Sequence, residues 1–354
     1  SFAISRLCVH EAYSEFTMIE RLRQGVSTCQ VDPCLDPDSM TTSDRRTKPA
    51  SPPLKTGREC AMLLCIGLAL AGCRDGSTVT GDDGAGRRNL LFVIADDLGK
   101  DAMPGFAEGT TKPYLPNLES LAAQGLTFSN LWVHPTCAPT RAAMLTGKFG
   151  LRTGVTRSGL ELAASETVIQ RYIAQGSDGA YASAVVGKWH LSNSPSFNPE
   201  SFGIDYYAGL LNFAPDSYYD WTLTADGVAT RNTGYITEVL TDLAIDWVGA
   251  QERPWFLWLA YTAPHTPFHA PPSEMHRQGD LAPFQRGMDA TPYYMAAIEA
   301  MDYQIGRLLD SLSEVERANT TVIFLGDNGT PGPVAQAPFE AGRVDRKSTR
   351  LNSS

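Results

Sequence analysis

The sequence predicts an α/β fold in which a mainly parallel sheet carries helices on both faces. Three observations predict it: short apolar runs that suit buried strands, helical periodicity between those runs, and enough apolar residues for a large core. The chain has 354 residues, of which 43% are hydrophobic and 9% aromatic, so one large domain or two ordinary ones can fold. Strands that alternate with helices favour a parallel sheet between two helical layers.

The predicted strands are short runs rich in Val, Ile, Leu, Phe and Trp, and each is followed by polar residues. Their lengths and composition are typical of strands that are buried on both faces. They span 90–95, 182–186, 255–261 and 321–325. Helices are predicted where apolar residues recur every three or four positions, at 118–122, 236–247 and 298–312.

The N-terminal region differs in composition from the rest. Residues 1–60 lack sustained periodicity and are rich in Ser, Thr, Pro and charge, so we expect a disordered or non-native leader. Basic residues then precede an apolar run at 61–71, which Gly72 and Cys73 follow. This order predicts a bacterial export signal over 61–73 whose end resembles a lipobox, with lipidation at Cys73. A buried core helix is the alternative, but the run is too short to span a bilayer, and a Gly- and Asp-rich linker follows at 74–88.

We therefore expect an exported protein, either periplasmic or anchored to the outer membrane of a bacterium through its lipid alone. At the other end, residues 346–354 lack apolar periodicity, and we interpret them as an artefactual tail. The folded domain is then 89–345, and we expect the natural chain to continue beyond it.

The distribution of charge and cysteine excludes two classes of protein for the folded part. Residues after 88 carry 18 basic and 28 acidic side chains, which argues against a nucleic-acid partner and fits a protein that binds cations. Six of the seven cysteines precede residue 74, and only Cys137 follows. A disulfide-bonded core is therefore excluded.

Side chains that can bind a metal or transfer a proton follow all four predicted strands. In an open α/β sheet, ligands bind outside the carboxyl ends of the strands. Any one of these side chains alone could be a helix cap, a solvated lysine or a core histidine, but four such strand ends favour a functional site. They are Asp96 and Asp97 after the first strand, Lys188 and His190 after the second, His265 after the third, and Asp327 and Asn328 after the fourth.

The acidic members of this set favour a hard divalent cation. Asp96, Asp97, Asp327 and Asn328 supply three carboxylates and an amide oxygen, which suit Ca²⁺ or Mg²⁺ and suit Zn²⁺ poorly. Without a cation, converging carboxylates would repel one another and their pKa values would rise. A bound cation could also act as a Lewis acid on a sulfate or phosphate oxygen.

The most specific pattern is Cys137-Ala138-Pro139-Thr140-Arg141, which Thr-Gly follows at 146–147. Taken alone, it fits a buried cysteine beside a proline in the first turn of a helix. With the following Thr-Gly, it resembles the signature of the formylglycine-dependent sulfatases, an arylsulfatase-like family of the alkaline phosphatase superfamily. The resemblance extends from about 89 to 339, through the paired aspartates, Gly-Lys-Trp-His-Leu at 187–191, Ala-Pro-His-Thr-Pro-Phe at 263–268 and Gly-Asp-Asn-Gly at 326–329.

The resemblance implies a metal-assisted hydrolase of sulfate esters, whose substrate is an aryl sulfate or a sulfated carbohydrate. A formylglycine-generating enzyme would oxidise Cys137. The cation, Ca²⁺ or alternatively Mg²⁺, would be held by the modified residue together with Asp96, Asp97, Asp327 and Asn328.

The resemblance also implies roles for the basic side chains. Arg141 would orient the formylglycine, Lys188 and His190 would contact it and the sulfate, and His265 would serve the leaving group. One hydroxyl of the hydrated aldehyde attacks sulfur, and loss of the proton of the other ejects sulfate. His190 is the candidate base for that proton, because it is partly neutral near pH 7. Lys188 and His265 are predicted to bind the substrate, and His269 is a weaker candidate whose alternative is a structural role.

The resemblance fails at a lysine that the family carries after the Asp-Asn pair. The sequence has Phe-Glu-Ala-Gly at 339–342 without it, so either Ala335 replaces the lysine or the motif lies beyond this chain. The smaller C-terminal subdomain of the family is absent too. We expect the exposed sheet edge to leave such a fragment unstable or inactive.

Two other functions stay open on the sequence alone. A phosphatase or phosphonate monoester hydrolase of the same superfamily would use the same metal site, and a catalytically silent binding lipoprotein would keep the fold. The natural sulfate ester and the oligomeric state are open as well. Tyr218, Tyr219 and Trp221 either stack on a ring of the substrate or lie buried.

Overall fold

The computed structural model describes residues 87–192, 197–211 and 214–339. The predicted leader at 1–60, the export signal with Cys73, nearly all of the linker and the tail at 346–354 lie outside the described residues. Within the described ranges, none of the helices has both the length and the apolar character needed to cross a membrane.

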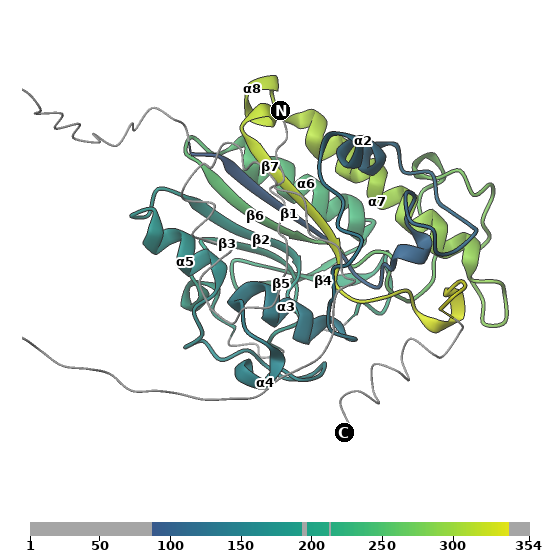
Figure 1. The fold of residues 1–354 in the computed structure, drawn as a ribbon, viewed down its shortest axis with the longest axis horizontal. Helices are drawn as coiled ribbons and strands as arrows, with labels where there is room; N and C mark the ends of the chain where they lie inside the picture. Colours follow the sequence, from purple (N-terminus) through teal and green to yellow (C-terminus); the bar gives the residue numbers. More distant parts are fainter. Residues whose placement is uncertain (1–86, 193–196, 212–213, 340–354) are drawn as a thin grey trace, which may run out of the picture. The chain divides into compact units, whose positions relative to one another are not determined.

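A mainly parallel sheet forms the centre of the fold (Figure 1). Across the part of the chain that the structure describes, its seven strands lie in the order β5 (Val228–Asn232), β4 (Trp221–Ala225), β3 (Tyr206–Leu210), β2 (Ala182–Lys188), β6 (Trp255–Ala260), β1 (Asn89–Ala95) and β7 (Thr320–Gly326). The strands from β3 to β7 in this order are parallel, whereas β4 and β5 form an antiparallel hairpin at the edge. The predicted α/β class is confirmed.

Helices cover both faces of this sheet, and alternate residues of the strands face the two layers (Figure 1). In β1, Val93 packs in the core on the side of α6 and α7, and Ile94 packs in the core on the side of α3. The first layer contains α2 (Pro116–Gln124), α6 (Ile236–Gly249) and α7 (Thr291–Ser311), and the second contains α3 (Cys137–Thr146), α4 (Gly150–Thr153) and α5 (Ile169–Gly176). The short elements are α8 (Glu314–Ala318), η1 (Lys100–Ala102), η2 (Pro199–Phe202), η3 (Ser273–Met275) and η4 (Gly332–Val334).

The four strands predicted from apolar runs are neighbours in the sheet, in the order β2-β6-β1-β7. β2 and β6 are buried along their whole length, which explains the continuously apolar sequence of β6 and the small and apolar residues of β2 before Lys188. The three remaining strands were not predicted. They lie on one side of β2, and β5 is largely exposed, so its sequence carries little apolar signal.

Gly187 lets β2 and β6 approach closely near their carboxyl ends. Its φ is 105°, and a Cβ at this position would overlap the backbone carbonyl of Ala260 in β6. Only glycine adopts this conformation without strain. The position fixes the direction in which the chain leaves β2, immediately before Lys188. Because β2, β6, β1 and β7 are parallel, their carboxyl ends lie along one edge of the sheet, where the site-bearing loops begin.

Candidate active site

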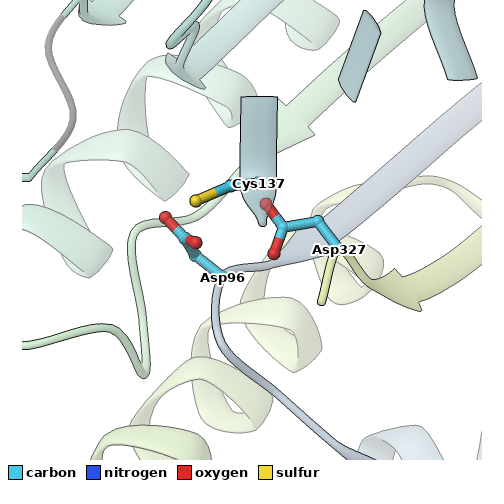
Figure 2. A group of neighbouring side chains, drawn as sticks. All are labelled: Asp96, Cys137 and Asp327. Carbon is cyan, nitrogen blue, oxygen red and sulfur yellow. The ribbon is translucent and has the colours of Figure 1, made fainter. Parts of the chain in front are cut away.

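Three side chains from three elements meet at this edge (Figure 2). Asp96 follows β1, Asp327 follows β7, and Cys137 is the first residue of α3. One carboxylate oxygen of each aspartate and the Cys137 sulfur lie within 4.8 Å of one another, and all three residues are buried. The structure thus places the residue at position 137 against acids from two neighbouring strands.

Arg141 joins the two aspartates. It lies one helical turn after Cys137 and therefore on the same face of α3, and its side chain is fully buried. Its Nε donates to Asp327 Oδ2 at 2.8 Å, and its Nη2 lies 3.7 Å from Asp96 Oδ2. Burial lowers the pKa of Arg141, but Asp327 and Asp96 raise it above its usual value. The guanidinium therefore stays charged between the two carboxylates.

Lys188, the last residue of β2, contacts Asp96 and Cys137. Its Nζ donates to Asp96 Oδ2 and lies 3.7 Å from Cys137 Sγ. Burial lowers the pKa of Lys188, but Asp96 raises it overall, so the side chain is an ammonium near pH 7. Its backbone carbonyl accepts from Arg141 Nη1, which ties the end of β2 to α3.

The Cys137 thiol is not an activated nucleophile in this setting. Burial and the charge of Asp96 raise its pKa to about 12, whereas cysteine nucleophiles depend on a lowered pKa. The position at the start of α3 does not offset these effects. Attack by a cysteine thiolate at neutral pH therefore has no electrostatic support here.

The two buried aspartates differ in their affinity for a proton. Burial raises the pKa of Asp96, but Lys188 and Arg141 lower it to about 2. Burial and the charge of Asp96 raise the pKa of Asp327 to about 7, although Arg141 opposes this. Without a cation, the Asp327 carboxyl is therefore partly protonated near neutral pH.

Asp97 and Asn328 continue the site along the same two loops. The Asp97 backbone N–H donates to Asn328 Oδ1 at 3.0 Å, and Asn328 Nδ2 donates to Asp97 Oδ1. Asp97 has a φ of 68°, a left-handed conformation that is uncommon for non-glycine residues, although aspartate adopts it more readily than most. His265 Nε2 lies 3.6 Å from Asp97 Oδ2. Ligand atoms of Asp96, Asp97 and His265 also lie within 4.8 Å of one another, so this group shares Asp96 with the cysteine group.

Both histidines at the strand ends favour the neutral form. Burial and the charge of Lys188 lower the pKa of His190 to about 3, and His190 also has a left-handed backbone with a φ of 59°. Burial likewise lowers the pKa of His265. His265 Nδ1 lies 2.7 Å from the Thr266 backbone carbonyl oxygen, which accepts a hydrogen bond from Nδ1–H. A neutral imidazole can accept a proton during a reaction.

His269 lies in a group of tyrosines and not among the contacts of the acidic cluster. Its ring stacks on Tyr218 with centroids 3.6 Å apart, and its Nε2 lies 3.3 Å from the Tyr235 hydroxyl. Its Nδ1 lies 3.0 Å from the Pro267 carbonyl oxygen. Burial lowers its pKa to about 4. These contacts favour the structural role of His269 over direct contact with a substrate.

The aromatic side chains considered for ring stacking are mostly buried. The Tyr218 hydroxyl lies 2.8 Å from the Thr262 carbonyl oxygen and 2.7 Å from the His265 carbonyl oxygen and donates its single proton to one or the other. Trp221 is buried and donates from its indole to a backbone carbonyl. Tyr219 alone of the three is exposed, at 40%, and its ring also stacks on Tyr235.

The donor set fits a hard divalent cation. Asp96 Oδ1 is buried and has no hydrogen-bond partner within the described part of the chain, as expected of an oxygen that binds a cation. The carboxylates of Asp96, Asp97 and Asp327 with the amide oxygen of Asn328 match the preference of Ca²⁺ and Mg²⁺ for oxygen. A divalent ion would also stabilise the ionised form of Asp327, whose pKa is otherwise raised.

Behind these ligands lies a hydrogen-bonded group that the sequence reasoning did not identify. Thr330 Oγ1 donates to Asp101 Oδ1, and the Tyr294 hydroxyl donates to the Asp97 backbone carbonyl at 2.8 Å. The position of Asp101, soon after the Asp96-Asp97 pair, could have suggested that it belongs to the site. Its partner Thr330, however, lies 229 positions away, and only the fold brings them together.

Comparison with known proteins gives one consistent result. The sulfatase family model matches residues 88–348. Human N-acetylgalactosamine-6-sulfatase is 30% identical over 288 residues, covering 72% of this chain and 52% of the human protein. An arylsulfatase of Klebsiella aerogenes is 27% identical over 315 residues, covering 69% of this chain and 66% of its own.

Solved structures agree with the sequence comparison. The crystal structure of Ps i-CgsB superposes with a TM-score of 0.61 at 29% identity, covering 73% of this chain and 62% of that one. The chain spans about half the length of the N-acetylgalactosamine-6-sulfatases that it matches. Because the family model covers well over half of its residues, this chain belongs to the sulfatase family.

Proposed function

We propose that the protein hydrolyses sulfate esters with a formylglycine nucleophile, made from Cys137 by a formylglycine-generating enzyme, and with Ca²⁺ or Mg²⁺. One observation carries this proposal. The Cys137 sulfur lies within 4.8 Å of carboxylate oxygens of Asp96 and Asp327 and 3.7 Å from Lys188 Nζ. A reactive group at this position would meet a cation and a charged donor at once.

The cation would be held by Asp96, Asp97, Asp327 and Asn328 together with the modified residue 137. When bound, it supplies Lewis-acid stabilisation of charge on the sulfuryl oxygens. Arg141 keeps two of these ligands in place, because it lies between the carboxylates of Asp327 and Asp96.

The modification would supply an aldehyde, whose hydrate offers two hydroxyls in place of the thiol. This fits the unmodified thiol, since its pKa of about 12 leaves it without a nucleophilic form near pH 7. Lys188 Nζ, which already lies beside Sγ, is placed to donate to a sulfuryl oxygen or to the nucleophile. Preorganised charged donors of this kind typically contribute several kcal/mol to the stabilisation of a transition state.

The histidines would move the protons. His190 is the proposed acceptor of the proton whose loss ejects sulfate: burial keeps its imidazole neutral near pH 7, although the same lowering of its pKa makes it a weak base. His265 presents Nε2 toward the Asp97 side of the site, where it can serve the leaving oxygen. Its Nδ1 is engaged with the Thr266 carbonyl, which fixes the ring orientation.

The charge of the buried site favours a sulfate over a phosphate monoester. The carboxylates of Asp96, Asp97 and Asp327 outnumber the cations of Lys188 and Arg141 by one, and a divalent ion reverses the sign to one net positive charge. A sulfate monoester carries a single negative charge and neutralises this site. A fully ionised phosphate monoester would leave an uncompensated negative charge, which is costly in a buried site.

The names of the relatives guide the choice of substrates. They include N-acetylgalactosamine-6-sulfatases and arylsulfatases, and Ps i-CgsB has been crystallised with k-i-k-neocarrahexaose. We therefore propose a sulfated carbohydrate or an aryl sulfate as the substrate of this protein.

The test begins with the residue at position 137. The protein is produced with and without a formylglycine-generating enzyme, and mass spectrometry of the peptide containing Cys137 identifies its chemical form. Modified protein is then assayed on 4-nitrophenyl sulfate, 4-nitrophenyl phosphate and a panel of sulfated oligosaccharides, with Cys137→Ala as the inactive control. Sulfate turnover that depends on both the modification and the divalent ion is expected. An unmodified cysteine in the competent host, or phosphate turnover above sulfate turnover, contradicts the proposal.

We also propose, from the sequence of residues 61–73 alone, that the protein is an exported lipoprotein with its lipid on Cys73. In a bacterial host, labelled palmitate should enter the wild-type protein and not Cys73→Ser. Equal labelling of both proteins, or none of either, would refute the anchor.

A further inference from the structure

The predicted metal ligands come from two loops that the sheet alone does not hold together. β1 and β7 pair along their length as far as Ala95 and Gly326, and the Asp327 N–H donates to the Ala95 carbonyl at 3.0 Å. Beyond that point the chains leave the ladder, while the ligands on both loops must keep distances set by a cation. Hydrogen bonds between Asp97 and Asn328 join the two loops directly, and further contacts hold the backbone behind these two residues.

A buried carboxylate supplies these contacts. Asp101 is 1% exposed and both of its carboxylate oxygens accept hydrogen bonds from the loop after β7. Thr330 Oγ1 donates to Asp101 Oδ1, and the Gln336 backbone N–H donates to Oδ2 at 2.9 Å. One side chain after β1 therefore holds two points of the segment that follows Asp327 and Asn328.

Thr330 extends this connection back to the metal ligands. Its Oγ1 accepts from the Gly99 N–H at 3.1 Å and lies 3.4 Å from the Tyr294 hydroxyl. The same hydroxyl donates to the Asp97 backbone carbonyl at 2.8 Å. Because the Thr330 proton goes to Asp101 and the Tyr294 proton goes to Asp97, the two hydroxyls meet as a packing contact, and the connection from Asp101 reaches Asp97 through this contact and through the Gly99 N–H. Asp97 at its end has a left-handed backbone, which the surrounding contacts support.

The close approach of these groups is built into the backbone. A Cβ on Gly99 would lie 2.5 Å from Thr330 Oγ1 and 2.6 Å from Asp101 Oδ1, far inside van der Waals contact. Gly99 therefore leaves the room in which the carboxylate and the hydroxyl meet.

We propose that Asp101, through Thr330, is a positioning residue of the metal centre. It aligns Asp97 and Asn328 without touching the cation. This inference rests on the metal site of the proposed function and adds a determinant of its affinity. Groups that orient metal ligands typically account for about 10- to 100-fold in metal affinity, and we expect a loss of that size when the connection is broken.

The test measures Ca²⁺ binding by isothermal titration calorimetry, which needs no catalytic turnover. Asp101→Asn removes one of the two acceptors, and Thr330→Val removes the bridging hydroxyl with little change of shape. We expect both to raise the Kd for Ca²⁺ by about 10- to 100-fold. Thr330→Ser keeps the hydroxyl and should restore a Kd close to that of the wild type.

Asp302→Asn is the matched control for general destabilisation. Asp302 is equally buried and accepts from the backbone N–H groups of Asn117 and Leu118, but it joins α7 to α2 and not the metal loops. It should lower the melting temperature and leave the Kd for Ca²⁺ unchanged. The Thr330 pair decides the question if Asp101→Asn does not fold.

The outcomes separate this inference from the proposed function. If folded Thr330→Val binds Ca²⁺ with the wild-type Kd, the positioning role is wrong and the proposed sulfatase site stands. If the wild-type protein binds neither Ca²⁺ nor Mg²⁺, the metal site is wrong and the positioning role is lost with it.

Discussion

Replacing Arg141 with leucine should destabilise the protein strongly in the absence of a metal. The guanidinium is fully buried, donates to Asp327 at 2.8 Å and lies 3.7 Å from Asp96. Its loss leaves two buried carboxylates with Lys188 as their remaining close cation. Removal of one member of a buried ionic group typically costs about 3–5 kcal/mol, and we expect a decrease of this size in the free energy of unfolding.

Urea unfolding with and without Ca²⁺ measures this effect. Arg231→Leu is the control, because Arg231 also pairs with an aspartate, Asp220 at 2.6 Å, but on the surface, where such pairs contribute little. A divalent ion should recover part of the stability of Arg141→Leu, since it compensates the same carboxylates. The reasoning is refuted if the two variants lose equal stability, or if Ca²⁺ stabilises the wild type and not Arg141→Leu.

Three further predictions follow from the site. Burial and Asp96 raise the pKa of Asp327 to about 7, so protons compete with Ca²⁺ for this carboxylate below that pH. Calorimetry should show that the Kd for Ca²⁺ rises by up to about tenfold per pH unit as the pH falls from 7 to 5.5. A Kd that does not change with pH would contradict this prediction. Tyr218→Phe removes a hydrogen-bond donor to the loop that carries His265. It should lower the free energy of unfolding in urea by about 1–3 kcal/mol and lower the kcat on 4-nitrophenyl sulfate. An unchanged kcat would show that the loop keeps its position without this hydrogen bond. Gly187→Ala should lower the free energy of unfolding by about 3 kcal/mol or more, because its Cβ would overlap the β6 backbone. Gly227 also has a positive φ, but a Cβ there would meet open space, so Gly227→Ala should lower it by only about 1–2 kcal/mol.

The sequence predicted the strands that carry the site because burial on both faces leaves a continuous apolar run. β6 is the clearest case, since all of its residues are buried. The β4–β5 hairpin was missed because β5 is polar and exposed. A signal was available in Asp226 and Gly227, which both have positive φ and form a turn sequence that favours two-residue hairpins.

The sequence predicted those site residues that directly follow a predicted strand, because each could be assigned separately. The separate predictions for Asp96, Cys137 and Asp327 required only the direction of the strands and a recognisable signature. Asp101 was beyond that reasoning, because its role depends on contacts from Thr330 and Gln336 in the loop after the neighbouring strand β7. Contacts between irregular loops leave no periodic pattern in the sequence.

The pairing of β1 with β7 has a consequence for biosynthesis. β1 is the first described strand to leave the ribosome and β7 is the last, yet the loops that follow them each contribute two of the five proposed cation ligands. A nascent chain can therefore form most of the parallel sheet and still lack a complete binding site. Added Ca²⁺ would favour only molecules in which β7 has docked beside β1, so calcium binding during refolding would report the moment at which the two ligand-bearing loops meet.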